Sequence, residues 1–218
     1  MTEPSGGSDK AKRPVAVPVI GLVALTAIGI TVLLGGLDER PDSPPPQLKP
    51  GDSLDQGQFE TQFVESKLTV ERAKSPFTDD KRFVDVVFKV TNKTDETISV
   101  GSLPYDKSRG YSFGGSLLKM DPPIKSKYGP RMFVDSKGVE SVQLHPAVPA
   151  TVIARFELEG AARPPEQVTF DVGVYEKAEN PLTGESLWLL PTEGGFLGKA
   201  ETKEVAAKVT LPVKPEGA

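Results

Sequence analysis

The longest uncharged stretch of the chain, Pro14 to Leu37, constrains the fold more than any other feature. It contains 24 residues, most of them apolar, and none is Asp, Glu, Lys or Arg. As an α-helix rising 1.5 Å per residue, it would reach about 36 Å, more than the ~30 Å hydrocarbon core of a bilayer. The stretch therefore predicts one transmembrane helix at 14–37.

The charges on either side of this stretch predict its orientation. Lys10, Lys12 and Arg13 precede it, and Asp38 and Glu39 follow it. Basic residues beside the first apolar segment tend to stay in the cytoplasm. We therefore expect a cytoplasmic tail at 1–13, a location in the plasma membrane and an extracytoplasmic C-terminal region.

A cleaved signal peptide is the alternative interpretation of the same stretch. Signal peptides have an apolar core of about 7–15 residues and an Ala-x-Ala-like exit. The stretch here is longer, and its small-residue exit is Gly35-Gly36. Within the predicted helix, the small residues Ala27, Thr31 and Gly35 recur every four positions, a spacing that lets membrane helices approach closely.

The composition of the remaining chain excludes several classes of protein. There is no cysteine, so neither a lipid-modified cysteine nor a disulfide is available. The residues after the apolar stretch carry 28 acidic and 23 basic side chains, which gives no basic face for nucleic acid. Disulfide-free export and a composition rich in Val, Ala, Gly and Pro fit a bacterium of the actinobacterial type.

Beyond the stretch, the sequence first predicts a stalk and then strands. Residues 38–53 contain Pro44-Pro45-Pro46 and read as a semi-rigid extended stalk. From Phe59 onward apolar residues alternate with polar ones, which indicates β-strands with one buried face. The alternation shifts by one position between Phe63 and Val64, which predicts a β-bulge.

The alternation is clearest in three later segments. They are Val84 to Val90, Val152 to Leu158 and Val205 to Val213, and Pro- and Gly-rich turns separate them from their neighbours. Short alternating strands of this kind are typical of an antiparallel β-sandwich. We expect the sandwich at 54–213 and a short tail at 214–218.

Several motifs resemble the bacterial immunoglobulin-like extracytoplasmic domains of unknown function. They are the opening PGDSLDQGQFETQFVESKLTV, the strand-turn-strand FVDVVFKVTNKTDETISV and the run LHPAVPATVIARFELEGAARPPEQVTFDV. Val90-Thr91-Asn92 corresponds to the family's Val-x-Asn before a turn, and Ala147 stands where the family has glycine. The resemblance spans roughly 51–213 and implies an all-β, immunoglobulin-like sandwich on a single membrane anchor. It implies no enzymatic activity.

The sequence shows no set of residues that predicts catalysis, a metal or a cofactor. His145 is the single histidine and lies beside Pro146 in a turn, without the partners that a triad or zinc site needs. We therefore expect no enzyme and no cofactor.

Two long irregular connections, 101–129 and 178–200, are the places where we expect function. Long glycine-punctuated loops on a rigid scaffold often carry binding sites. The first connection gathers the aromatic and arginine residues that protein interfaces favour. The predicted partner-binding residues are Tyr105, Arg109, Tyr111, Phe113 and Tyr128.

Three functional hypotheses remain open at this point. The first is a non-catalytic, membrane-anchored binding module of the cell envelope, with a protein or an envelope polymer as partner. The second is an envelope small-ligand carrier or hydrolase with a pocket between 101–129 and 178–200. The third is a structural accessory subunit of a larger membrane complex.

Overall fold

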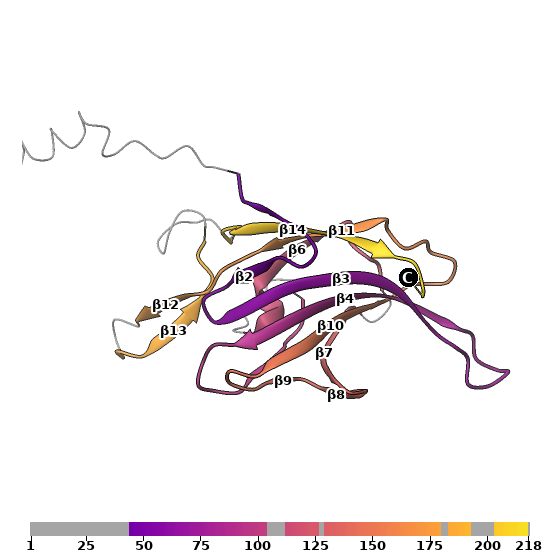
Figure 1. Ribbon diagram of the computed structural model, residues 1–218, viewed down its shortest axis with the longest axis horizontal. Helices are drawn as coiled ribbons and strands as arrows, with labels where there is room; N and C mark the ends of the chain where they lie inside the picture. The colour runs from indigo at the N-terminus through magenta and orange to yellow at the C-terminus, as the bar shows by residue number, and fades with distance from the viewer. Residues whose placement is uncertain (1–43, 104–111, 127–128, 180–182, 193–202, 218) are drawn as a thin grey trace, which may run out of the picture. The chain divides into compact units, whose positions relative to one another are not determined.

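The structure is a computed structural model that describes residues 44–103, 112–126, 129–179, 183–192 and 203–217 (Figure 1). The chain divides into two compact units, Met1–Pro44 and Pro45–Ala218, and the described residues belong almost entirely to the second. The predicted tail 1–13 and the predicted helix 14–37, with Ala27, Thr31 and Gly35, lie outside the described residues. Within the described part of the chain, no helix is long and apolar enough to cross a membrane.

The second unit is an all-β, sandwich-like domain built from two layers. One layer has the strand order β3-β4-β10-β7-β8, and the other has the order β6-β11-β14. The strands of the first layer are β3 (Phe59–Glu71), β4 (Lys81–Asn92), β10 (Pro149–Glu157), β7 (Arg131–Ser136) and β8 (Val139–Ser141), with β2 (Ser53–Asp55) added to β3. Those of the second layer are β6 (Leu117–Asp121), β11 (Gln167–Val172) and β14 (Ala207–Lys214).

The two layers join where the end of β14 runs beside β3. Val213 pairs with Ser66 in a parallel register, and the Ser66 hydroxyl donates to the Pro212 carbonyl at 3.0 Å. β1 (Gln47–Leu48) is also parallel to β14 and pairs with its first residues. The prediction of an antiparallel sandwich therefore holds for the other pairs in both layers, and these two pairings make the sheets mixed.

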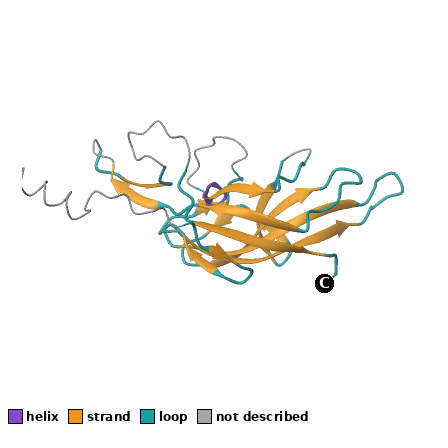
Figure 2. Cartoon of the chain, turned by 90° about the horizontal axis from the view of Figure 1, so that it is seen from above, coloured by secondary structure: helices purple, strands orange, loops and turns teal. Residues whose placement is uncertain are grey.

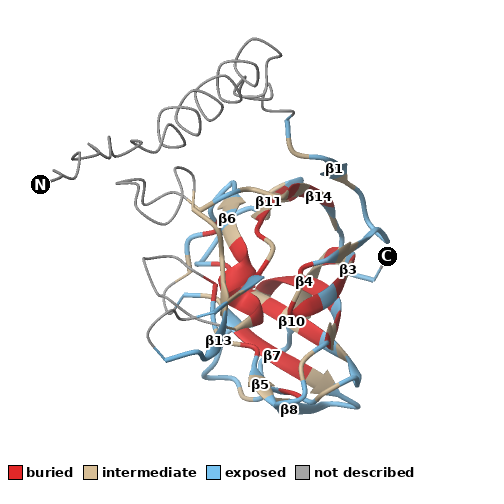
Figure 3. Cartoon of the chain, turned by 90° about the vertical axis from the view of Figure 1, so that its left-hand side faces the viewer, coloured by how far each residue is buried: buried red, intermediate tan, exposed pale blue. Residues whose placement is uncertain are grey.

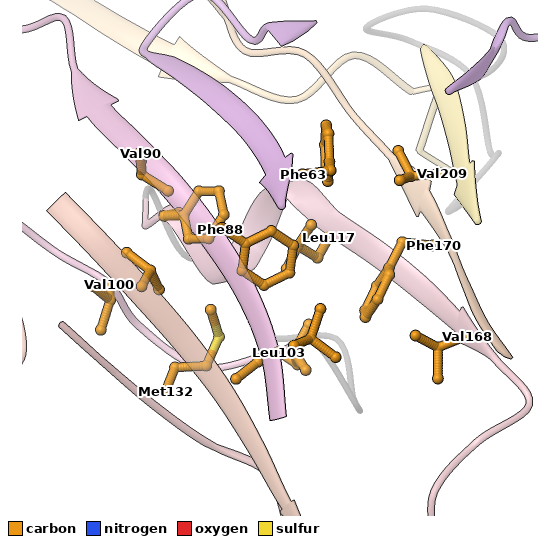
Figure 4. Close-up of a cluster of buried hydrophobic side chains, with 14 of the residues drawn as sticks. Phe63, Phe88, Val90, Val100, Leu103, Leu117, Met132, Val168, Phe170 and Val209 are labelled. Carbon is orange, nitrogen blue, oxygen red and sulfur yellow. The ribbon is translucent and has the colours of Figure 1, made fainter. Parts of the chain in front are cut away.

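The core between the layers is rich in phenylalanine (Figure 4). Phe88 of β4 contacts Phe63 of β3 at 5.9 Å between ring centroids, and it reaches Phe170 of the opposite layer at 6.0 Å. Both contacts are edge-to-face, the geometry that aromatic pairs favour. Because each fully buried phenylalanine contributes about 1.5–3 kcal/mol, these rings are a main source of the domain's stability.

The predicted bulge in β3 is confirmed. The pairing of β3 with β4 shifts between Phe63 and Glu65, so Val64 is the extra residue and is 38% exposed. A slip of one residue exchanges the two faces of a strand. In a regular strand, Phe63 and Leu68 would point to opposite faces, because one position is odd and the other is even. The bulge therefore lets both pack toward the core.

The outer face of the first layer carries a second cluster, which the sequence did not indicate. Asp85 of β4 is buried although it lies on this face, and it forms an ion pair with Arg155 of β10 at 2.8 Å. The Arg155 guanidinium lies over the rings of Phe83, at 4.9 Å, and Phe133, at 5.5 Å. As a result β4 is buried on both faces (Figure 3).

The domain begins earlier in the chain than the sequence indicated. Residues 45–53 were expected in the stalk, but Gln47 pairs with Lys208 and Ser53 pairs with Gln62. A proline-rich segment can join a sheet edge because an edge strand needs only part of its hydrogen-bonding groups. The last strand likewise includes Lys214, which was expected in the tail.

The remaining regular structure is short and lies in the connections (Figure 2). β5 (Ile98–Ser99) pairs with β9 (Gln143–Leu144), and β12 (Glu176–Glu179) pairs with β13 (Ser186–Leu189). A 3₁₀ turn, η1 (Phe113–Ser116), precedes β6.

Candidate functional site

Several connections leave the sandwich at the same end, and we call this end the loop end. They are the turn 56–58 before β3, the connection 93–116 between β4 and β6, and the connection 173–206 between β11 and β14. Hydrogen bonds join the described parts of all three, and β12–β13 extends from this end in Figure 1. The first part of the predicted connection 101–129 and the base of the predicted connection 178–200 therefore lie side by side. The prediction of one irregular connection over 101–129 is wrong, because β6 runs through it and carries the chain to the opposite end of the sandwich.

Gln56 is the residue that ties the turn before β3 to the β11–β14 connection. Its side chain is fully buried, and its Nε2 donates to the Gly173 carbonyl at 2.9 Å. Its Oε1 accepts a hydrogen bond from the Thr61 hydroxyl at 2.6 Å, and its backbone carbonyl accepts one from Tyr175 N–H at 2.9 Å. A buried amide satisfied in this way orders both segments, since an unpaired one would cost about 1–3 kcal/mol.

Tyr175 continues this link to the β4–β6 connection. Its hydroxyl donates to the Ser112 carbonyl at 2.8 Å, and its ring packs edge-to-face on Phe59. Burial raises the pKa of the Tyr175 phenol above its ordinary value, so the group stays protonated and remains a donor. One buried side chain therefore holds the two long connections together.

Glycine makes two close approaches possible at the loop end. Gly57 has a φ of +73°, and a Cβ at this position would overlap the Tyr175 carbonyl oxygen. Gly101 has a φ of +69°, and a Cβ there would overlap the Ser112 side chain. Both positions favour glycine for its left-handed backbone and for its lack of a side chain.

The residues that flank the segments 104–111 and 193–202 are joined by backbone contacts. Gly114 N–H donates to the Val100 carbonyl at 2.8 Å, which brings the two sides of the first segment together. Thr192 and Lys203 form an antiparallel bridge across the second. Each segment therefore begins and ends at residues that are paired with each other.

At this end an ion pair joins Asp55, the last residue of β2, to Lys93, the first residue after β4. Lys93 Nζ lies 2.7 Å from Asp55 Oδ2, and its hydrogen bond is the main reason that the pKa of the Asp55 carboxyl is lowered. Both side chains are substantially exposed, so the pair contributes little to stability.

The structure describes one of the five residues predicted to bind a partner. Phe113 is fully buried and contacts Phe59 at 5.8 Å and Phe88 at 5.4 Å between ring centroids. It is a core residue and offers no surface to a partner, because the 3₁₀ turn points it between the layers. The other four, Tyr105, Arg109, Tyr111 and Tyr128, lie outside the described residues.

The turn that contains His145 is organised by Asn92. The buried Asn92 side chain donates to the carbonyls of Leu144, at 3.0 Å, and Glu96, at 2.7 Å. His145 Nδ1 lies 3.1 Å from the Thr97 hydroxyl and is exposed. Among the described residues, no cluster of three or more His, Cys, Asp or Glu side chains could hold a metal ion.

The described surface includes the following two open hollows. One, of about 410 Å³, lies at the edge of the second layer and is lined by Leu103, Leu117, Leu118, Lys119, Met120, Asp121 and Pro123. The other, of about 460 Å³, lies beside β7 and β8 and is lined by Arg131, Met132, Phe133, Glu140, Ser141, Val142 and Gln143. The first belongs to the connection 101–129 and the second lies outside both long connections.

The comparisons with known proteins concern architecture. No protein-family model matches the chain, and no curated protein matches it. It is similar to the crystal structure of an uncharacterized β-sandwich protein from Clostridium difficile 630, with a TM-score of 0.39 and 9% sequence identity. The similarity covers 80% of this chain and 97% of that chain.

Sequence reasoning missed the residues that build the loop end. Gln56 and Tyr175 are polar residues at the edges of strands, and such residues usually lie in solvent. The one signal that could have found them is Gly57, because a glycine directly after a strand can mark a close approach of another backbone.

Proposed function

We propose that this chain is a single-pass protein of the plasma membrane whose extracytoplasmic, immunoglobulin-like domain binds a partner at the loop end. The partner class is another envelope protein or an envelope polymer. In this proposal the N-terminus is cytoplasmic, the helix 14–37 lies in the lipid bilayer and the domain has no catalytic role.

The strand order supports the immunoglobulin-like part of this proposal. Constant-type immunoglobulin domains place strands A, B, E and D in one sheet and C, F and G in the other. Here β3, β4, β10 and β7 correspond to the first set, and β6, β11 and β14 correspond to the second, in the same chain order. The contact between β14 and β3 then corresponds to a pairing of the first and last strands.

The observation that carries the binding proposal is the convergence of both long connections at the loop end. In this strand order they are the B–C and F–G loops, which in variable immunoglobulin domains belong to the antigen-binding end. The hydrogen bonds of Gln56 and Tyr175 fix their bases. A fixed base lowers the entropy cost of binding, since fewer residues become ordered when the partner arrives.

The test compares partner recovery by the wild-type chain and by loop variants. The full-length protein is solubilised mildly from its own membranes, and the proteins recovered with it are identified by mass spectrometry. The triple variant Tyr105→Ala, Arg109→Ala, Tyr111→Ala is expected to lose a stoichiometric partner. Arg163→Ala, an exposed position in the connection between β10 and β11 at the opposite end, is the matched control and should keep it.

Two results would contradict the proposal. Unchanged recovery by the triple variant would exclude these residues as the binding surface. Loss of the partner in Arg163→Ala as well would also contradict it, because Arg163 lies at the opposite end of the domain. An unchanged thermal unfolding midpoint of the triple variant shows that its loss of the partner does not come from unfolding.

A further inference from the structure

The N-terminal part of the chain joins the sandwich at the loop end. β14 starts directly after the connection 173–206, and β1 pairs in parallel with its first residues (Figure 3). Lys208 N–H donates to the Pro46 carbonyl at 2.9 Å, which fixes the entry point of the chain beside the start of β14. β2 then runs antiparallel to β3 and brings the chain back to the same end. The domain is therefore attached to the preceding chain by the end that is proposed to bind a partner.

The connection from the proposed membrane helix to this entry point is short. Seven residues, 38–44, lie between the apolar stretch 14–37 and Pro45, and we call them the tether. Even when fully extended, the chain spans at most about 28 Å from Leu37 to Pro45. If 14–37 lies in the bilayer, as proposed above, the tether holds the entry point within about 28 Å of the membrane surface.

The β3–β4 hairpin marks the opposite end of the domain. β3 begins at the loop end with Phe59 and reaches the hairpin after Glu71, a length of about 40 Å for a strand of this size. Figure 1 shows this hairpin on the right and β12–β13 on the left. Whichever way the domain turns about the tether, the loop end is the end that the tether holds near the bilayer.

The loop end carries an excess of acidic residues. Its three connections contain nine acidic and six basic side chains. The acidic ones are Asp95, Glu96, Asp106, Glu176, Glu179, Glu185, Glu193, Glu201 and Glu204, and the basic ones are Lys93, Lys107, Arg109, Lys177, Lys199 and Lys203. Six of the nine acids belong to the described residues, where all six are exposed and none forms an ion pair.

The neighbouring charges do not cancel this excess. Asp55 adds an acid, which is paired with Lys93. The entry segment adds Lys49 and Asp52, and the β7–β8 turn adds Asp135 and Lys137, one charge of each sign in both cases. The tether itself contains the acids Asp38, Glu39 and Asp42 and the base Arg40. The part of the molecule nearest to the bilayer is therefore acidic.

An acidic face does not suit a lipid surface or a second copy of itself. Segments that lie on membranes use basic residues to bind anionic lipid. Two copies of one acidic face repel each other, and so do this face and an envelope polymer that carries phosphate or carboxylate groups. A protein surface rich in Lys and Arg is complementary to it, and opposite charges steer such partners together.

We propose that the loop end binds the extracytoplasmic face of an integral membrane protein, and that this face is basic and lies next to the bilayer. The inference rests on the function proposed above and narrows its partner class. The length of the tether determines where the partner lies, and the excess of acids determines the sign of its charge.

The first experiment measures which end of the domain faces the bilayer. Because the chain has no cysteine, Leu187→Cys in β13 and Phe77→Cys in the hairpin each provide a single, exposed thiol for a fluorescent donor. Each full-length variant is reconstituted into phosphatidylcholine vesicles with an acceptor on the lipid headgroups. We expect more energy transfer from position 187 than from position 77. Equal transfer, or the reverse order, would overturn the proposal.

The second experiment identifies what the loop end touches. The photo-reactive residue p-benzoylphenylalanine replaces Leu187 in the full-length chain, which is irradiated in the membranes of its own host, and Phe77 is the matched control position. We expect an adduct at position 187 with a protein that remains in the membrane after alkaline extraction. Adducts with lipid, with a polymer, with a second copy or with an extractable protein would overturn the proposal, and so would no adduct above the control.

The third experiment tests the charge of the contact with the protein so identified. The triple variant Glu176→Gln, Glu179→Gln, Glu185→Gln should bind it about 10-fold more weakly and with less dependence on salt, since each exposed charge pair contributes only a few-fold. The matched control removes three exposed acids at the opposite end, with Asp79→Asn, Glu159→Gln and Glu166→Gln, and should keep the wild-type affinity. Equal affinities of the two triple variants would contradict the acidic contact. The unfolding midpoints of both should stay at the wild-type value, because all six side chains are exposed.

This inference and the proposed function can fail separately. Suppose that the variant Tyr105→Ala, Arg109→Ala, Tyr111→Ala loses a partner that proves to be an extractable protein or a polymer. The binding role of the loop end then stands, and the membrane-protein partner is excluded. If that variant keeps its partner, the binding role itself fails. A mature chain that lacks residues 1–37 would remove both the anchor and the tether argument.

Discussion

Replacement of Asp85 by asparagine tests the charged cluster on the outer face of the first layer. Asp85 is buried, and both of its oxygens accept hydrogen bonds from Arg155, each at 2.8 Å. Asparagine keeps the size of the side chain and removes its charge. The Arg155 guanidinium, with its side chain 15% exposed, then lies between Phe83 and Phe133 without its main counter-charge.

The expected loss follows from the environment of Arg155. Removal of one partner of a buried ion pair costs about 3–5 kcal/mol, because the other charge stays buried and uncompensated. Glu71 still lies 2.7 Å from Arg155, and its side chain is 54% exposed, so it offsets a small part of that cost. We therefore expect Asp85→Asn to lower the free energy of unfolding by about 3 kcal/mol.

A double-mutant cycle separates this charge effect from a loss of packing. Arg155→Met keeps an unbranched apolar side chain between the two rings but leaves the Asp85 carboxylate unpaired. The double variant removes both charges, and we expect its destabilisation to be smaller than the sum of the single effects by about 2 kcal/mol.

The assay is urea denaturation of the domain, with the slope of the transition checked against the wild type. A loss below about 1 kcal/mol for Asp85→Asn would refute the assignment of a buried, mutually dependent pair. Additive effects in the cycle would refute it as well, since they would show that the two side chains do not stabilise each other.

Three further predictions concern other parts of the structure. Ala147 has a φ of +56°, a conformation that costs a residue with a Cβ about 1–2 kcal/mol. Ala147→Gly should therefore raise the free energy of unfolding by about 0.5–1 kcal/mol, because the entropy of glycine in the unfolded chain offsets part of the gain. An unfolding midpoint at or below that of the wild type would contradict this. Gly57→Ala should lower the free energy of unfolding by about 2–4 kcal/mol, because the new Cβ meets a backbone carbonyl. Gly51→Ala is the control: Gly51 has a φ of +92° and open space around it, so the loss should be only about 1 kcal/mol. Equal losses of stability would exclude the close approach at the loop end. Hydrogen bonding by Lys214 lowers the pKa of the Glu65 carboxyl from 4.5, so the stability that this pair contributes is present above pH 4.5 and is lost as the pH falls through the lowered pKa. Denaturation curves between pH 6 and pH 3 should therefore show the wild type losing about 0.5–1 kcal/mol more than Glu65→Gln, and parallel losses would argue against the pair.

Much of the strand content could be predicted from sequence because it depends on a local pattern. Val84, Val86, Phe88 and Val90 alternate in the sequence and all four are buried. The bulge at Phe63 was equally predictable. In a strand with one buried face, a one-residue shift in the alternation requires an extra residue in that strand, which is a β-bulge. The transmembrane helix at 14–37 remains a prediction.

Shorter elements could not be predicted in this way. β6, β12 and β13 have four or five residues each; β6 and β13 lie inside the two connections that appeared irregular in sequence, and β12 overlaps the start of the second. A period of two cannot be recognised over so few positions, and their pairing with neighbours decides their conformation. The assignment of Phe113 to a binding surface failed for a related reason, because aromatic residues are common both at interfaces and in cores.

What the sequence alone determined is the set of long strands, their buried faces and the all-β class of the domain. Only the tertiary structure decided which strands became neighbours. It placed β14 beside β3 in a parallel register, joined Asp85 to Arg155 across 70 residues and joined Gln56 to Gly173 across 117. Alternation is a property of a few consecutive residues, whereas pairing depends on the free energy of closing long loops and on the packing of one shared core.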